Sequence, residues 1–254
     1  MTGFGIFLSK ELLEHWRTRR LPVLSIVFVA FGIGSPLLAR FMPELISALA
    51  ANDGIVIDIP PPTAADAVAQ FVRNLGQTGI LAAVLLAMGS VAAEKERGTA
   101  ALWLTKPMSR GAFLGSKAAG LAAVLATGIV GAGIGGFAYT GFLFEAPDAA
   151  GWAPMCVLLL LQMAAYAAVT FLGSTVTRSP LAAAGIGIGL LTVIAIVGAL
   201  PVLGGWTPSG LADAALAIGT GEVPEQLWQP VAATIGLIVA ALVASSVAFR
   251  RQEL

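Results

Sequence analysis

Six long stretches without a charged residue run through this 254-residue chain, and they constrain its fold more than any other feature. A transmembrane helix needs roughly 20 mostly apolar residues to cross about 30 Å of hydrocarbon. Only 11% of the residues are charged, against about 25% in an ordinary soluble domain. The chain is therefore predicted to be an all-α membrane protein with six transmembrane helices, within residues 21–39, 74–93, 118–144, 149–177, 179–212 and 226–249.

The fifth stretch is longer than one span requires. Pro201, Gly204, Gly205 and Pro208 break its apolar pattern, which places the helix at about 181–203. The segment that follows has room for one short helix near 211–218. We expect the whole chain, 1–254, to form a single transmembrane domain.

The basic residues indicate the orientation of the spans, because short cytoplasmic loops carry an excess of Lys and Arg. Six spans put both termini on one side of the membrane. Twelve of the 14 basic residues fall on that side, and the exceptions are Arg40 and Arg73. Both termini are therefore predicted to be cytoplasmic, in a multi-pass protein of the cell (inner) membrane.

The segment before the first span, residues 1–20, has the pattern of an amphipathic elbow helix. Phe4, Leu8, Leu12 and Trp16 recur every four residues, and Lys10, Glu14 and Arg17 cluster on the opposite side. Such a helix lies in the plane of the membrane interface. It serves as a positive-inside anchor or has a mechanical role.

Residues 42–72 are expected to form a long outer loop. The spacing of Thr63 and Asp66 resembles a capping box, in which the hydroxyl and the carboxylate satisfy free backbone amides. This spacing indicates a short external helix leading to Arg73, but an ordinary connector is the favoured interpretation.

Two patterns within the spans favour contacts between helices. Gln162, Tyr166, Thr170 and Ser174 follow each other at four-residue steps, so they form one polar row that must face protein or water rather than lipid. This row is a candidate translocation path or a set of interhelical hydrogen bonds. Gly185 and Gly189 form a small-xxx-small pair, which suits packing within the subunit or contact between subunits.

The six stretches lack the residues that intramembrane proteases need and the ionisable groups that ion-coupled carriers usually have, although sodium bound by backbone groups stays open. No carboxylate lies within any of them, and the single histidine, His15, is expected at the interfacial surface. Ionisable groups inside a membrane usually mark proton or ion pathways. Met155, Cys156 and Met163 are soft potential ligands, but their spacing favours core filling over a metal site. The chain is therefore predicted to be non-catalytic, with no metal.

The segment 94–117, between the second and third stretches, is longer than a hairpin needs. Charged ends flank an apolar turn with Leu102 and Trp103, then a break at Pro107 and a second short helix that Ser109 could cap. Exposed Leu102 and Trp103 favour a docking surface. An amphipathic piece lying on the membrane is the alternative.

This segment, together with the topology of the whole chain, resembles the signature of the ABC type-2 exporter permeases. That signature runs Glu-basic-Glu-x-Gly-Thr, an apolar turn, Pro-x-Ser-Arg and a closing Gly-x-Lys or Gly-Lys. The positions that match are Glu94, Lys95, Glu96, Gly98, Thr99, Leu102, Leu104, Pro107, Ser109, Arg110 and Lys117. Lys106 and Ser116 are small departures. The resemblance implies a coupling helix that docks in a groove of a cytoplasmic ATPase and transmits its motion.

The energy source is expected in another polypeptide, because the chain has no Gly-x-x-x-x-Gly-Lys-Ser/Thr phosphate loop. The resemblance implies a permease homodimer with two ATPase subunits, which would bind the ATP and Mg. The alternatives are a mechanotransmission subunit that acts on an extracytoplasmic partner and, less favoured, an ion-coupled carrier. Charge-free spans favour an apolar or amphipathic substrate. Membrane lipid is expected to surround the spans, and no nucleic acid is expected as a partner.

Overall fold

The computed structural model describes residues 2–52, 59–99, 109–200, 203–224 and 226–252, and in these ranges it is helical without strands. Six helical segments of the described chain are long and apolar enough to cross a membrane, with α3 and α4 counted as one. The elements are α1 (Thr2–Arg17), α2 (Arg20–Asn52), α3 (Ala64–Ala87), α4 (Ala92–Glu96), α6 (Arg110–Leu143), α7 (Ala149–Val176), α8 (Pro180–Gly198), η1 (Gly204–Trp206), α9 (Gly210–Gly219) and α10 (Trp228–Arg250). The predicted all-helical membrane fold with six spans is confirmed.

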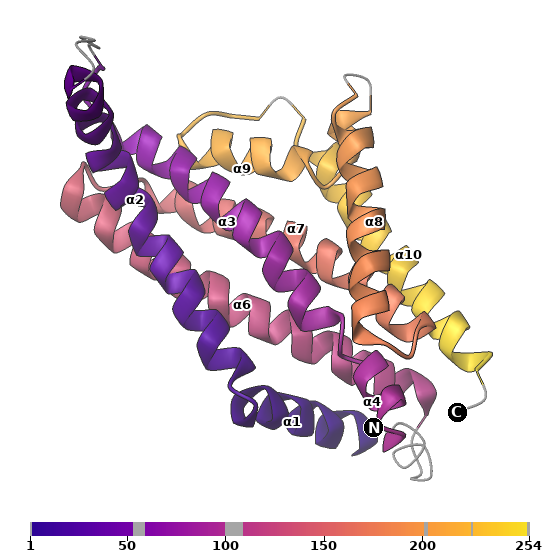
Figure 1. Ribbon diagram of the computed structural model, residues 1–254. Helices are drawn as coiled ribbons and strands as arrows, with labels where there is room; N and C mark the ends of the chain where they lie inside the picture. Colours follow the sequence, from indigo (N-terminus) through magenta and orange to yellow (C-terminus); the bar gives the residue numbers. More distant parts are fainter. Residues whose placement is uncertain (1, 53–58, 100–108, 201–202, 225, 253–254) are drawn as a thin grey trace.

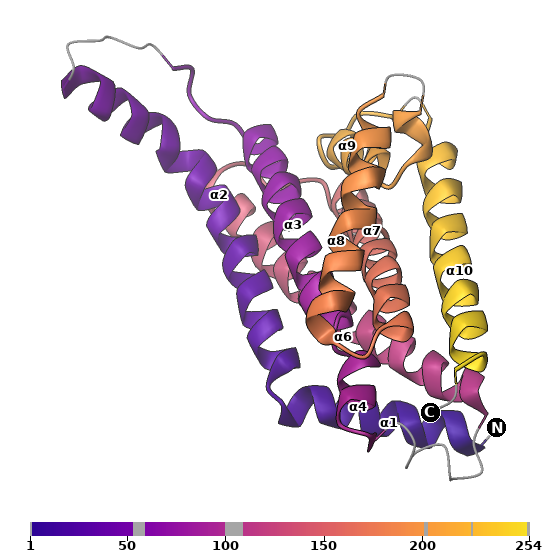
Figure 2. The same cartoon turned by 45° about the vertical axis from the view of Figure 1, so that its right-hand side comes forward.

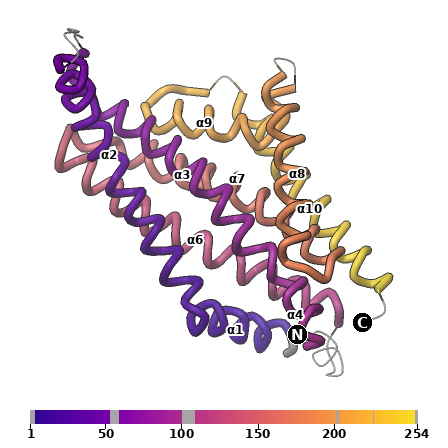
Figure 3. The backbone as a smooth tube through the Cα atoms, viewed as in Figure 1, coloured from indigo at the N-terminus to yellow at the C-terminus, as the bar shows by residue number. Residues whose placement is uncertain are grey.

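The two termini lie at the same end of the bundle (Figure 1). Helix α1 crosses below the spans at this end, and α9 lies across the opposite end (Figure 2). The chain turns sharply from α1 into α2 at Arg19, whose φ is +60° (Figure 3). We call the part formed by α1, α4, the start of α6 and the last turns of α7 and α10 the terminal end.

The helices occupy most of the segment 42–72, which was expected to be an outer loop. Helix α2 continues through Pro36 and Pro43 to Asn52, and α3 begins at Ala64. The short external helix expected before Arg73 is therefore the first part of α3. Its start confirms the capping box: Thr63 N donates to Asp66 Oδ2 over 2.8 Å, and Thr63 Oγ1 accepts from the Asp66 amide.

The other helix boundaries agree with the apolar pattern to different degrees. Helix α9 occupies the place predicted for a short helix, whereas α8 ends at Gly198, before the expected 203. Helix α6 begins at Arg110, a full two turns before the expected start of the third span. No separate short helix precedes α6 in the described residues, and Ser109 instead caps α6 itself by accepting from Ala112 N over 3.1 Å.

The core lies where α2 packs on α6 and α3, and where α7 packs on α10, α8, α9 and α3. Helices α2 and α6 approach so closely at Gly32 that a Cβ atom there would lie 2.5 Å from the Ala132 carbonyl oxygen. Further along, Phe71 of α3 and Trp152 of α7 have ring centroids 4.9 Å apart. Small residues at such crossings let helix backbones meet where lipid provides no hydrophobic drive.

The glycines of α8 divide between two faces. A Cβ atom on Gly187 would lie 2.7 Å from Thr170 Oγ1, so this glycine allows α8 to pack on α7. A Cβ atom on Gly185 or Gly189 would meet no atom within 4 Å. The expectation that Gly185 and Gly189 pack within the subunit is therefore wrong for the described residues. Their contact with a second subunit stays a prediction.

Candidate functional site at the terminal end

Helix α7 holds the start of α4 through one serine. Between α3 and α4 the regular helix is interrupted, and Ser174 lies beside this break. Its hydroxyl donates to Met88 O over 2.8 Å and accepts from the amides of Val91 and Ala92, each over 3.0 Å. The side chain thus replaces backbone hydrogen bonds that the break removes, because buried amides require partners. It fixes the position of α4 relative to α7.

We expect Ser174→Ala to lower the free energy of unfolding by about 1–3 kcal/mol, because two buried amides lose their acceptor. Thr192→Ala is the matched control: Thr192 is exposed and its hydroxyl only donates to Ile188 O in its own helix. Thermal unfolding of both variants in the same detergent measures the difference. Equal midpoints would show that Ser174 does not hold the break.

A partly buried cluster of charges joins α4 to α1 and α6. Lys117 of α6 is 2% exposed, and its ammonium group lies 2.7 Å from Glu94 Oε1 and 3.1 Å from Glu11 Oε1. Lys10 of α1 is also within 2.9 Å of Glu11 and of Glu14, and 3.4 Å from Glu94. We call these five residues the charge cluster. It links three separate elements at the beginning of the segment 94–117.

The charges in this cluster stabilise one another against the cost of burial. Burial disfavours the charged form of Lys10, but the hydrogen bonds to Glu14 and Glu11 outweigh this and raise its pKa. Burial likewise opposes ionisation of Glu14, yet the hydrogen bond from Lys10 lowers its pKa. The carboxylates of Glu11, Glu14 and Glu94 lie within 4.8 Å of one another. Lys10 and Lys117 lie among these three carboxylates and offset two of their three negative charges.

His15 lies beside the cluster and is buried, so its expected place at the interfacial surface is wrong. A Cβ atom on Gly120 of α6 would lie 3.6 Å from its Nε2, which shows how closely α1 approaches α6. Burial lowers the pKa of His15, and its Nδ1 has no hydrogen-bond partner among the described residues. Burial therefore favours the neutral imidazole, which packs against α6.

Helix α1 presents a polar face to the protein, which the apolar periodicity did not indicate. Its buried side carries Phe7, Glu11 and His15, whereas Phe4 and Trp16 of the apolar row are 41% and 62% exposed. Leu8 and Leu12 are half-buried, so the row is open to lipid at its two ends, Phe4 and Trp16. The buried face is polar because Lys10 and Lys117 neutralise its carboxylates.

Two further basic residues of the segment bind the ends of other spans. Lys95 donates to the carbonyls of Thr175 and Thr177 at the end of α7. Arg110 donates to Phe249 O, Arg250 O and Gln252 O over 3.1, 2.9 and 3.2 Å at the end of α10. Cations favour helix C-termini because the last carbonyls are unpaired and carry partial negative charge.

The remaining residues of the segment have separate places. Glu96 and Gly98 are exposed, and Gly98 follows α4 with φ +70°, a conformation that favours glycine. The Thr99 hydroxyl donates to Glu94 O over 3.2 Å. Leu102, Trp103 and Pro107 lie outside the described residues. The structure thus brings Glu94 and Lys117 together, whereas Arg110 reaches towards α10.

The polar row of α7 faces the protein interior, since Gln162, Tyr166, Thr170 and Ser174 are all at most 7% exposed. The Gln162 amide donates to Tyr166 Oη over 3.0 Å and to Pro208 O over 3.1 Å, and Thr170 donates to Tyr166 O. These bonds are structural contacts within α7 and between α7 and the turn that joins η1 to α9. A role in a translocation path stays a prediction.

The fold and the terminal end define a class of protein, namely a multi-pass membrane protein in which several spans contact one short helix, α4. Residues 6–216 match the family model described as ABC-2 family transporter protein. The chain is 30% identical over 206 residues to the "uncharacterized transmembrane protein YxlG" of Bacillus subtilis (strain 168). The matched region covers 80% of this chain and 79% of that protein. This chain belongs to the ABC-2 transporter family.

Proposed function

We propose that this chain is the permease subunit of an ATP-driven exporter and that residues 94–117 receive the motion of a separate cytoplasmic ATPase. The observation that supports this most is the connectivity of the segment. Glu94 binds α1 and α6 through the charge cluster, Lys95 binds the end of α7, and Arg110 binds the end of α10. A displacement of this segment would reach four helices at once.

The ATPase supplies the chemistry in this proposal. ATP and Mg bind to the partner, because the chain has no phosphate loop of its own. The exposed residues Glu96 and Gly98 leave the start of the segment accessible to a partner. Leu102 and Trp103 are the proposed apolar anchors, since binding energy concentrates in buried aromatic side chains.

We further propose that two copies of this chain form a homodimer. The open face of α8 at Gly185 and Gly189 supports it, because a second helix could approach the backbone there. Exposed apolar side chains, including Leu181, Ile188 and Val193, extend along the same helix. The full complex would hold two permeases and two ATPases.

The decisive experiment is co-purification of the ATPase with wild-type permease and with Trp103→Ala. Truncation of an aromatic anchor typically costs about 2 kcal/mol or more, so we expect about a thirtyfold loss of ATPase binding. Phe142→Ala is the control: Phe142 is 80% exposed at the other end of the bundle, and its removal should leave binding unchanged. The native mass of the complex gives the stoichiometry.

Two results would contradict the proposal. If Trp103→Ala retains full ATPase binding and full transport, the segment is not the anchor, and the membrane-surface alternative gains. If the complex hydrolyses ATP but moves no substrate across vesicle membranes, the mechanotransmission alternative replaces export.

A further inference from the structure

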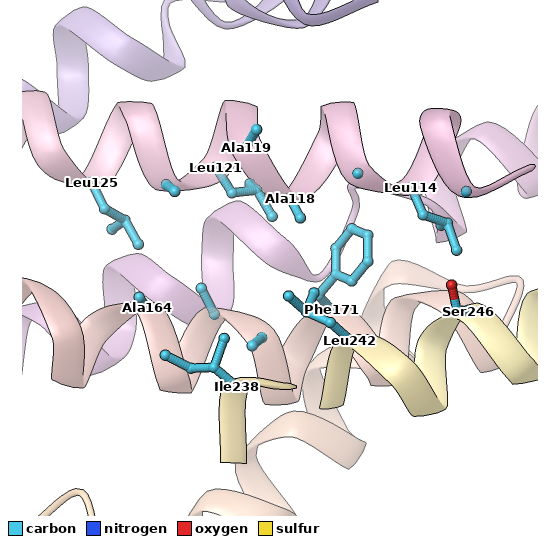
Figure 4. Close-up of a pocket in the computed structure, with 15 residues that line it drawn as sticks. Leu114, Ala118, Ala119, Leu121, Leu125, Ala164, Phe171, Ile238, Leu242 and Ser246 are labelled. Carbon is cyan, nitrogen blue, oxygen red and sulfur yellow. The ribbon is translucent and has the colours of Figure 1, made fainter. Parts of the chain in front are cut away.

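An apolar pocket of about 420 Å³ opens between α6, α7 and α10 (Figure 4). Leu114 and Leu125 of α6 line one wall, with Ala164 and Phe171 of α7 and Leu242 of α10 opposite. All three helices are long and apolar enough to cross a membrane, so we expect the pocket at membrane depth. Pockets of 300–1,000 Å³ are typical of sites that bind small molecules.

A line of residues on α10 leads from this pocket to a positive charge. Ile238, Leu242 and Ser246 line the pocket at four-residue steps, and Arg250 is the next position on the same face. The Arg250 side chain is exposed and has no ion pair with any described residue. Its backbone carbonyl accepts a hydrogen bond from Arg110 over 2.9 Å. In the part of the chain that the structure describes, the Arg250 guanidinium has no ion-pair partner, and it stands one helical turn beyond the apolar lining.

The start of α6 adds to the positive potential at the same mouth. Gly111, in the first turn of α6, lines the pocket, and the first amides of a helix carry partial positive charge. The Arg110 guanidinium lies beside it, bound to the end of α10. The site thus has an apolar interior at membrane depth and a cationic mouth where the spans end.

We propose that this pocket binds one anionic phospholipid from the leaflet on the side of the termini. One acyl chain occupies the apolar pocket, and the phosphate lies between Arg250 and the start of α6. The charge of the mouth selects this occupant, because a basic pocket between spans at the membrane surface attracts anionic head groups. The proposal requires only that the protein is in a membrane and does not depend on the proposed ATPase.

The test measures lipid retained by the purified protein. Wild type is exchanged into detergent containing either phosphatidylglycerol or phosphatidylcholine, and native mass spectrometry counts the lipids bound to each chain. We expect one retained phosphatidylglycerol, held about fivefold more strongly than phosphatidylcholine. Arg250→Gln should remove this preference, and Ala122→Phe, which fills the pocket from α6, should abolish retention of both lipids.

Matched controls separate the pocket from a general surface effect. Arg251 is one residue beyond the line that leads to the pocket, and Ala244 is exposed outside the lining. Arg251→Gln and Ala244→Phe should retain lipid as the wild type does. Unfolding midpoints of all four variants identify any that are misfolded, and Arg250→Gln, a surface change, keeps the test valid if Ala122→Phe is one of them.

Three outcomes would overturn the proposal. Equal retention of the two lipids by the wild type would show that the mouth does not select an anionic head group. An equal loss of selectivity in Arg250→Gln and Arg251→Gln would show a diffuse charge effect. A wild-type dimer without bound lipid that Ala122→Phe dissociates would assign the pocket to a second copy of the chain.

Discussion

Lys117→Met is expected to lower the free energy of unfolding by about 3–5 kcal/mol, because it leaves buried carboxylates without their main partner. Lys117 is the innermost cation of the charge cluster and lies within 3.1 Å of both Glu11 and Glu94. Lys10 cannot replace it fully, since it is 27% exposed and also binds Glu14. Thermal unfolding in detergent measures the loss, and limited proteolysis shows whether α1 separates from α6.

The control is Arg40→Met, which removes the pair between Arg40 and Glu44 at 2.9 Å. Both side chains of that pair are exposed, and exposed pairs typically contribute less than about 1 kcal/mol. Lys117→Arg, a second control, keeps the positive charge at this position but changes the geometry of the cationic group. If Lys117→Met costs no more than Arg40→Met, the charge cluster does not hold α1 in place.

Gly32→Leu is expected to separate α2 from α6 and to lower the free energy of unfolding by about 1–3 kcal/mol, the usual cost of overpacking a core. The new Cβ atom would lie 2.5 Å from the Ala132 carbonyl oxygen and 2.8 Å from its Cα. Because both atoms belong to the backbone of α6, no side-chain rotation relieves the clash. The measurements are the unfolding midpoint and the yield of monodisperse protein.

Gly34→Leu is the matched variant, two residues away in the same helix. A Cβ atom on Gly34 meets nothing within 4 Å, so this substitution should leave the midpoint near that of the wild type. Both variants add the same apolar side chain to the same span. A similar loss in both would mean that glycine flexibility, and not the close approach at Ala132, matters in α2.

The sequence was sufficient for features that depend on local patterns. Apolar length predicted the six spans, the Thr63 and Asp66 spacing predicted the start of α3, and the glycine and proline breaks predicted α9. Helix ends were less accurate, because Arg40, Arg73 and Lys117 were taken as boundaries. Charged residues end the apolar stretch but not the helix, since α2, α3 and α6 continue through them.

The contacts of the candidate site could not be predicted in the same way. The signature identified Glu94 and Lys117, but Glu11, the other carboxylate that binds Lys117, is 106 residues from it in the sequence. The apolar periodicity of α1 gave no sign that part of its charged side is buried. A hydrophobic pattern cannot show which charges pair with one another in the fold. The pair formed by Lys10 and Glu14 at four-residue spacing was the only local signal, and it fits an exposed face equally well.

The contacts of Arg110 also impose an order on how the protein is made. Its carbonyl partners begin at Phe249, 139 residues later in the chain, and extend to Gln252. During synthesis, α6 enters the membrane long before these carbonyls leave the ribosome. The terminal end therefore closes only after the last helix has been inserted, so an unfinished chain cannot present the complete segment to a partner.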